Sequence, residues 1–158
     1  MILHGNQRGG VRDLARHLLK DENEHVDVYE LRGFVSDNLK SALNETYALS
    51  KATKCKQFLY SLSGNPPAQE NASIEDFLDA AERVEHGLGL TNQPRAVVFH
   101  EKKGRRHAHV VWSRIDISEM KAIQLSFTKR KLLEISRELF IKHDWQMPRG
   151  FMQSEERD

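Results

Sequence analysis

Hydrophobic positions recur along the chain with two different periods, one typical of helices and one typical of strands. Residues 11–20 carry an apolar stripe with helical spacing, formed by Val11, Leu14, Ala15 and Leu18. Residues 25–32 alternate instead, with Val26, Val28 and Glu30 on one face and Asp27, Tyr29 and Leu31 on the other. The pattern therefore predicts an amphipathic helix followed by a strand with two different faces.

The same analysis over the whole chain predicts the element order βαβαβαββα. Strands are expected over residues 1–4, 25–32, 56–63, 95–100 and 107–114, and helices over residues 11–20, 36–51, 73–89 and 128–142. The stretch 63–73, with its glycine and prolines, is expected to be flexible. Strands joined by helices, plus one tight hairpin, indicate an α+β fold, a single domain whose central, mainly antiparallel sheet has about five strands and flanking helices.

Composition narrows the class of protein. At 158 residues and 39% hydrophobic content, the chain can fill the core of one domain, expected over residues 1–150. Residues 151–158 are expected to form a polar tail, which is compatible with a further domain in a longer protein. The sequence shows no long apolar run and no signal pattern, and it has a single cysteine, Cys55. We therefore expect a cytoplasmic protein without a membrane contact.

The net charge of +1 conceals separate acidic and basic segments. Acidic residues dominate residues 21–30 and 70–85, whereas basic residues cluster at 51–56, 102–106 and 129–131. Two interpretations are open for the basic clusters. Either they line one surface that binds phosphate groups, or they are ordinary solvated side chains at turns and helix ends.

One predicted hairpin carries three histidines, His100, His107 and His109. A pairing of Glu101 with Arg106 around a four-residue loop would place His100 opposite His107, on the face that His109 also shares. Three imidazoles on one face form a metal site with open coordination positions, although histidines on strands are also common as structural residues. The other histidines have no partner at metal-binding spacing: His4, His25, His86 and His143.

The spacing of these histidines resembles a motif of mobilisation relaxases. His100 is followed seven positions later by His107, then by one residue and His109, in a strand that continues with two valines. This pattern is similar to the third motif of the MobA-like relaxases of plasmid and T-DNA transfer, in the HUH endonuclease superfamily. The likeness covers most of the chain, including the first helix and residues 58–63, but the third motif is its specific part.

The resemblance implies a reaction, a cofactor and partners. Relaxases of this kind hold Mg²⁺ or Mn²⁺ on three histidines, and three imidazoles alone would also suit Zn²⁺. They nick single-stranded DNA at an origin of transfer, keep the 5′ phosphate covalently attached and later rejoin the strand. In a bacterial cytoplasm, the further partners implied are accessory mobilisation proteins and the coupling protein of a type IV secretion system.

The resemblance also implies DNA contacts around the hairpin. Ser61 and Ser63 match the second motif loosely and are expected to contact DNA on the 3′ side of the nick. Basic residues beside the histidines are candidate phosphate contacts: Lys102, Lys103, Arg105 and Arg106. Lys102 also stands where the family usually has an aspartate, and Ser113 stands where the family commonly has an asparagine. A carboxylate that orients the metal-binding histidines is therefore not expected at position 102.

The position of the nucleophile departs from the family pattern. Relaxases of this kind carry a tyrosine in an Ala-x-Tyr-Leu-Leu segment, whereas residues 15–19 read Ala-Arg-His-Leu-Leu and place His17 there. A neutral imidazole has a free lone pair near pH 7, so His17 could attack phosphorus and form a phosphoramidate. Asp13, one helical turn earlier, could orient the ring. Tyr29 is the rival nucleophile, and His17 could also be a plain boundary residue of its helix.

Two other functional classes stay open on the sequence. One is a catalytically silent relaxase-like domain that binds DNA, and the other is a hydrolase that holds zinc on the same three histidines. The hydrolase is disfavoured because no acid and base pair accompanies the hairpin and because the basic clusters suit a polyanion.

Overall fold

The computed structural model describes residues 1–20 and 25–153. The strands of the main sheet are β1 (Ile2–Arg8), β2 (His25–Arg32), β3 (Leu59–Asn65), β4 (Arg95–Lys102) and β5 (Arg105–Ser113). The helices are α1 (Val11–Leu18), α2 (Leu39–Ser50), α3 (Ile74–Gly87) and α4 (Thr128–Lys142). A small hairpin of β6 (Ile115–Asp116) and β7 (Lys121–Ala122) and a 3₁₀ turn at Arg149–Phe151 were not predicted.

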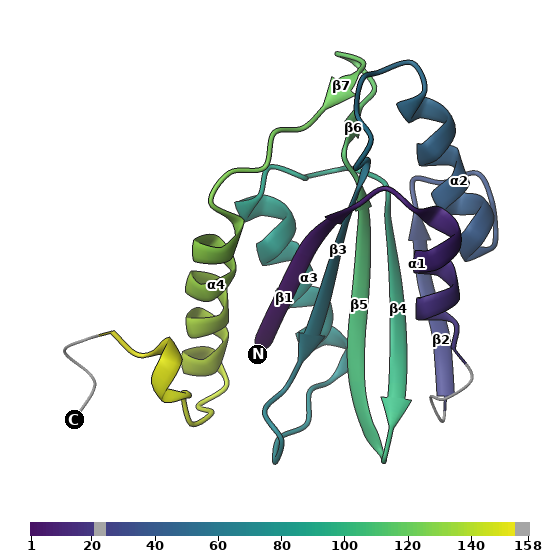
Figure 1. Ribbon diagram of the computed structural model, residues 1–158. Helices are drawn as coiled ribbons and strands as arrows, with labels where there is room; N and C mark the ends of the chain where they lie inside the picture. The colour runs from purple at the N-terminus through teal and green to yellow at the C-terminus, as the bar shows by residue number, and fades with distance from the viewer. Residues whose placement is uncertain (21–24, 154–158) are drawn as a thin grey trace.

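The central sheet has the strand order β1-β3-β5-β4-β2, and every neighbouring pair is antiparallel. Helices α1 and α2 cover one face at the β4 and β2 side, whereas α3 and α4 cover the other face (Figure 1). The expected α+β fold with a five-stranded antiparallel sheet and flanking helices is therefore confirmed. No helix within the described ranges is long and apolar enough to cross a membrane.

Two hydrophobic cores lie on the two faces of this sheet. The α1 and α2 side is filled by residues such as Leu14, Leu18, Leu43, Val98 and Val111. The α3 and α4 side is filled by residues such as Phe77, Val84, Phe99, Trp112 and Leu139. Alternating residues of β4 and β5 thus enter different cores, which is why both central strands are apolar on both faces.

Side chains and turns fix the ends of several elements. The Asn38 side chain accepts a hydrogen bond from the Ser41 backbone at the start of α2 (3.0 Å), and Ser73 with Asp76 forms a capping box at the start of α3. The β4–β5 hairpin turns over two residues, Lys103 and Gly104, both with positive φ. The expected four-residue loop was therefore too long by two residues, because the strand pairing continues to the turn.

The first and third strands differ from their predicted bounds. β1 extends to Arg8 rather than ending at residue 4, and β3 runs on through Gly64 into the stretch that was expected to be flexible. Gly64 pairs with Leu3 on one side and Ala108 on the other, so backbone hydrogen bonding to two neighbours holds this glycine in the sheet. The acidic residues 21–24 and the tail residues 154–158 lie outside the described residues.

A bulge interrupts β2 and changes its predicted faces. The register with β4 shifts between Val28 and Glu30, so that Glu30 pairs with Val97 and Tyr29 has no ladder partner. Glu30 is thereby moved to the α3 side of the sheet, where its carboxylate binds Arg95 at 2.6 Å. The strict alternation expected for residues 25–32 is therefore wrong after Val28, because one extra residue inverts the side-chain direction.

Candidate functional site

The predicted histidine register of the hairpin is confirmed. His100 pairs with His107, and Val98 pairs with His109, across β4 and β5. The ring centres of His100 and His109 lie 4.6 Å apart, and those of His100 and His107 lie 6.0 Å apart. Three imidazoles from two adjacent strands therefore form one cluster on the α1 side of the sheet.

Helix α1 brings a fourth imidazole to this cluster. Its stripe of Leu14 and Leu18, which are 1% and 0% exposed, anchors the helix in the core beneath it. His17, which precedes Leu18, then lies over the sheet with its ring edge-on to that of His109, and the two ring centres are 5.8 Å apart. The residue at the position of the family tyrosine thus lies beside the histidines of the hairpin.

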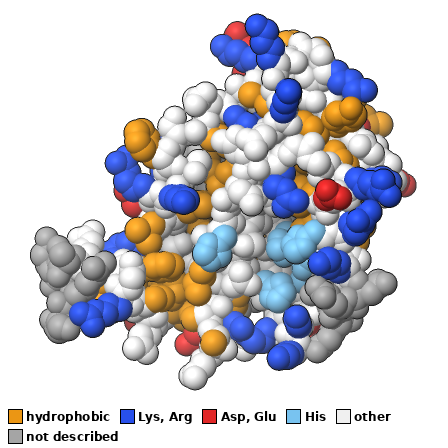
Figure 2. Space-filling view, viewed as in Figure 1, with side chains coloured by type: hydrophobic (Ala, Val, Ile, Leu, Met, Phe, Trp, Pro, Cys, Tyr) orange, Lys and Arg blue, Asp and Glu red, His pale blue; other side chains and the backbone are white. Residues whose placement is uncertain are grey.

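A cavity of about 170 Å³ opens beside these rings. Polar side chains from four elements line it, namely His4, Asn6 and Arg8 from β1, His17 from α1, Ser61 and Ser63 from β3, and His109 from β5. Figure 2 shows histidine side chains gathered near the middle of this face, with lysines and arginines around them. The cavity is therefore polar, and its charged side chains are cationic.

His4 also lines this cavity, although in the sequence it has no histidine at metal-binding spacing. It pairs with Ser63, and Ser63 pairs with His109 on the next strand. The connection depends on β3 lying between β1 and β5, which no local spacing in the sequence reveals. Asn6 and Arg8, two and four residues further along β1, share the same face and line the same cavity.

The environment keeps the three hairpin histidines uncharged. Burial, followed by the neighbouring charges of His100, His17 and His107, lowers the pKa of His109 to about 3. Burial also lowers the pKa of His100 and His107 below the ordinary value. The neutral form is the one that has a lone pair for a metal ion.

The hairpin histidines fit a divalent ion in donor chemistry and spacing. Imidazole nitrogens about 2.1 Å from a shared ion place their ring centres roughly 5 Å apart, close to the separations seen here. His100 Nε2 donates to the carbonyl oxygen of Leu18 at 2.5 Å, which leaves the lone pair of the neutral ring on Nδ1. Metal-binding histidines commonly donate their second N–H to a carbonyl in this way. The Leu18 carbonyl is therefore the group that orients the His100 ring.

The side chains are not arranged as a closed metal site. Within residues 1–20 and 25–153, no group of three or more histidine, cysteine, aspartate or glutamate side chains could hold a metal ion as it stands. Glu101 is not part of such a group: it follows His100 on β4 and points to the other face, although both residues border one small cavity with Asp27 and Arg106.

The two candidate nucleophiles are separated by the sheet. Tyr29 contacts Phe99 at 5.3 Å between ring centres, and Phe99 belongs to the core on the α3 and α4 side. Its side chain is 45% exposed and is not near the histidine cavity. Asp13 is exposed on α1, and in the described part of the chain it makes no hydrogen bond to His17. The geometry thus brings His17, but not Tyr29, to the cluster.

The basic residues of the hairpin turn do not all adjoin the histidines. Arg105 donates to the carbonyl oxygens of Pro66 (3.0 Å) and Pro67 (2.9 Å), so it fastens the segment after β3. Arg106 lies over the Phe99 ring on the opposite face and borders one small cavity with His100, and its expected contact with phosphate stays a prediction. Alternation along the strand explains its place on the opposite face, since Arg106 is one residue from His107. Lys102 and Lys103 lie at the exposed tip.

A comparison with protein-family models gives a match over most of the chain. The family described as "Relaxase: MobA/VirD2-like, nuclease domain" matches residues 16–145, a segment that includes His17 and the three hairpin histidines. A search of curated proteins gives no match.

Proposed function

The chain belongs to the MobA/VirD2-like relaxase family, nuclease domain, and from this membership we propose that it nicks and rejoins one DNA strand at an origin of transfer. Nicking of DNA during plasmid mobilisation is the general activity of this family. The covalent intermediate, the metal dependence and the roles of individual residues are the specific parts of the proposal.

The observation that carries the proposal is the position of His17. Its ring lies 5.8 Å from that of His109 and borders the same polar cavity as Ser61 and Ser63. The proposed nucleophile, the imidazoles of His4 and His109 and two hydroxyl groups thus border one space. This is the set that phosphoryl transfer needs, because that reaction depends on positioning and on stabilisation of charge.

His17 is the proposed nucleophile. A neutral ring nitrogen attacks the scissile phosphorus, and a P–N bond forms as the bond between phosphorus and the 3′ oxygen breaks. The 3′ oxygen leaves with the bonding electrons and takes up a proton, while the 5′ phosphate stays on His17. Attack by the 3′ hydroxyl in the reverse direction restores the strand and the free imidazole, so rejoining needs no ATP.

His100, His107 and His109 are the proposed ligands of a divalent ion, with Mg²⁺ or Mn²⁺ preferred over Zn²⁺ from the family resemblance. When bound, the ion supplies positive charge at the scissile phosphate. The chain's own contribution is orientation, since the Leu18 carbonyl fixes the His100 ring and the paired strands fix His107 and His109. Ser61 and Ser63 are proposed to hold the strand beside the cavity.

The test is formation of a covalent adduct on single-stranded DNA. The protein is mixed with a 3′-labelled oligonucleotide carrying the transfer origin of the element that encodes it, with Mn²⁺ or with EDTA. We expect a labelled protein band that survives denaturation and appears only with the metal. A phosphoramidate is labile in acid and a phosphotyrosine is not, so acid treatment should release the label if His17 is the nucleophile.

A catalytically silent DNA-binding domain is the second candidate. What favours it is that, in the described part of the chain, the histidine side chains as they lie do not form a group that could hold a metal ion. Binding of the origin oligonucleotide without any adduct, in Mg²⁺, Mn²⁺ or Zn²⁺, would replace the enzyme proposal with this one. An acid-stable adduct would keep the enzyme but remove the histidine nucleophile.

A further inference from the structure

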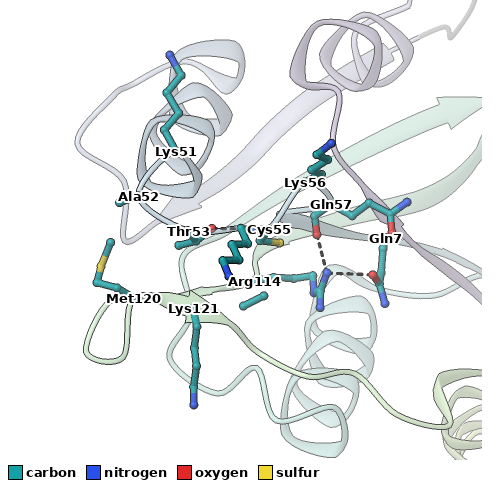
Figure 3. Close-up of a pocket in the computed structure, with 12 residues that line it drawn as sticks. Gln7, Lys51, Ala52, Thr53, Cys55, Lys56, Gln57, Arg114, Met120 and Lys121 are labelled. Atoms are coloured by element: carbon teal, nitrogen blue, oxygen red, sulfur yellow. Dashed lines mark hydrogen bonds between the residues drawn. The ribbon is translucent and has the colours of Figure 1, made fainter.

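A second basic region lies at the end of the sheet opposite the histidine hairpin. Residues 51–57, between α2 and β3, form one wall of a cavity of about 1030 Å³. Gln7 of β1, Arg114 after β5, and Met120 and Lys121 of the small β6–β7 hairpin form the other walls (Figure 3). Segments from four parts of the chain therefore meet around one open space.

The lining of this cavity is strongly basic. Its cationic side chains are Lys51, Lys54, Lys56, Lys121 and Arg114. The four lysines are exposed, and none of the twelve lining residues, all of them in the described part of the chain, is acidic. Positive charge concentrated in a concave surface attracts an anion more strongly than the same charge on a flat surface.

Arg114 contributes a buried cationic side chain to the wall of this cavity. It is only 7% exposed, and its guanidinium donates to Gln7 Oε1 (2.9 Å), to the Gln57 carbonyl (2.6 Å) and to the Ile123 carbonyl (2.9 Å). These acceptors are all uncharged, and within the described ranges Nε has no partner and no carboxylate pairs with the side chain. A buried cation without a counter-ion is costly, so an anion in the cavity would offset that cost.

The basic cavity connects to the histidine cavity along β1 and β3. Arg8 lines the histidine cavity, but its neighbour Gln7 points to the other face of β1, so the connection does not run through Gln7. It runs through Gly9, which follows Arg8 and lines an adjoining cavity that shares Lys54 and Lys56 with the basic one. The backbone at Gly9 packs so closely on the Lys56 carbonyl that an added Cβ would lie 2.3 Å from it. From Ser63 to Gln57 the chain covers about 20 Å, which corresponds to roughly six nucleotides at the per-strand rise of B-form DNA and to fewer in an extended strand.

An aromatic ring stands beside this path. Tyr47 of α2 is 44% exposed and lines an adjoining cavity of about 540 Å³ together with Lys51, Lys54 and Lys56. The Lys51 ammonium lies 4.7 Å from the centre of the Tyr47 ring. Lysines for the backbone and an exposed ring for a base are the combination by which proteins bind single strands without reading their sequence.

We propose that the cavity formed by residues 51–57, Arg114 and Lys121 binds phosphate groups of single-stranded DNA, a few nucleotides from the cleavage point, with Tyr47 stacked on a base. The identity of the strand rests on the proposed function. The anion site itself rests on the charge, the burial of Arg114 and the continuity of the surface.

Cys55 reports whether the cavity is occupied. It is the chain's single cysteine, it is partly exposed, and it lines the cavity between Lys54 and Lys56. The rate of its alkylation by a maleimide is measured in EDTA, so that no cleavage chemistry is involved. We expect an oligothymidylate of about twenty nucleotides, long enough to span both cavities at B-form rise, to slow alkylation several-fold.

Charge reversal then tests the lysines. Lys54→Glu with Lys56→Glu is compared with Lys129→Glu and Lys131→Glu, a matched double reversal on α4 that lies outside the cavity. Oligothymidylate binding is measured by fluorescence anisotropy over a range of salt concentrations. If two phosphate contacts are lost, the slope of log K against log salt should fall by about 1.4 for the cavity variant and stay unchanged for the control.

Tyr47 is tested in the same assay. Tyr47→Ser should weaken binding of the oligothymidylate, whereas Tyr47→Phe, which keeps the ring, should bind as the wild type does. A melting temperature for each variant shows whether the contact of Tyr47 with Phe58 has been disturbed. Equal weakening in the serine and phenylalanine variants would contradict stacking.

The outcomes separate this inference from the proposed function. Protection of Cys55 by inorganic phosphate alone, with an unchanged DNA salt slope, would assign the site to a free anion and overturn the DNA assignment. No protection by either probe would overturn the site altogether. A changed salt slope without any covalent adduct would support the cavity as a DNA site and contradict the proposed nicking activity. A covalent adduct with an unchanged salt slope would support the nicking activity and contradict the cavity as a DNA site.

Discussion

Two polar clusters are buried against opposite faces of the same sheet, and they differ in how their charges are balanced. On the α3 side, Glu85 accepts hydrogen bonds from Trp112 (2.9 Å), Arg95 (3.2 Å) and Arg32 (2.5 Å). On the α1 side, the cavity beside His17 and His109 is lined by imidazoles, hydroxyl groups and one arginine, with no carboxylate among its described lining residues.

The difference separates a structural network from a binding site. A buried network in which every charge has a partner fixes the packing of its elements and leaves nothing for a ligand. A partly buried cluster of polar groups without partners is unfavourable in the free protein. Its hydrogen-bond donors favour a bound anion, and the lone pairs of its neutral imidazoles favour a bound metal ion. The sheet thus has a paired ionic network on one face and the proposed reactive groups on the other.

Among substitutions on the two faces, the largest expected effect is that of replacing His17. His17→Ala should reduce adduct formation by roughly a thousandfold or more, which is about 4 kcal/mol of activation free energy, because the attacking nitrogen is lost. The fold should be unaffected, since His17 is exposed. Adduct yield on a labelled origin oligonucleotide measures the effect, and His17→Tyr, which restores the family residue, is the informative companion.

Substitutions on the opposite face should lower the free energy of unfolding and leave the proposed DNA chemistry unchanged. Glu85→Ala leaves the buried Arg95 cation and the Trp112 N–H without their acceptor, so we expect a loss of about 3 kcal/mol in the free energy of unfolding. Urea denaturation measures it. Glu82→Ala is the matched control, because Glu82 also binds Arg95 (3.0 Å) but its side chain is 57% exposed, and it should cost at most about 1 kcal/mol.

Acid should weaken the same network. Burial alone would raise the pKa of Glu85, but hydrogen bonds from Trp112 and Arg32 and the charges of Arg32 and Arg95 outweigh it and hold the pKa below its ordinary value. This carboxylate therefore stabilises the fold fully above its unfolded-state pKa, and the contribution is lost as the pH falls through the folded-state pKa. Glu85→Gln should make the decline in unfolding free energy from about pH 5 to about pH 3 shallower than in the wild type.

The smallest effect is expected at Tyr29. Tyr29→Phe should leave the adduct yield within about twofold of the wild type, because the ring lies on the face away from the histidines and its contact with Phe99 needs no hydroxyl. The same labelled oligonucleotide assay applies. Loss of the adduct in this variant, with His17→Ala still active, would reverse the assignment of the nucleophile.

Local sequence patterns predict the pairing of the hairpin histidines, but they do not predict which other residues line the cavity. The pairing of His100 with His107 follows from alternation and from a tight turn at Gly104, which are both short-range properties. His4 could not be placed in this way, because it meets His109 only through the position of β3 between their strands. Pairing between distant strands depends on the whole core and leaves no local spacing to read.

Two further departures have local physical causes that the sequence pattern conceals. The bulge in β2 exchanges the faces of the residues after Val28 and brings Glu30 to Arg95. The pattern of residues 25–32 alone does not reveal this ion pair, because Arg95 lies on another strand. Arg105, an expected phosphate contact, donates to two proline carbonyls of a neighbouring segment that the sequence pattern does not reveal, and its contact with phosphate stays a prediction. The domain limits at residues 1–150 and the individual roles of the site residues stay predictions.

The hydrogen bond between Leu18 and His100 joins positions 82 residues apart in the chain. Contacts of such long sequence separation form late, because a large loop must close before they are made. During synthesis, α1 emerges from the ribosome long before β4 and β5 exist. If His17 is the nucleophile, the nascent chain therefore carries it before the hairpin histidines have been made, and we expect no adduct with DNA until the C-terminal half is complete.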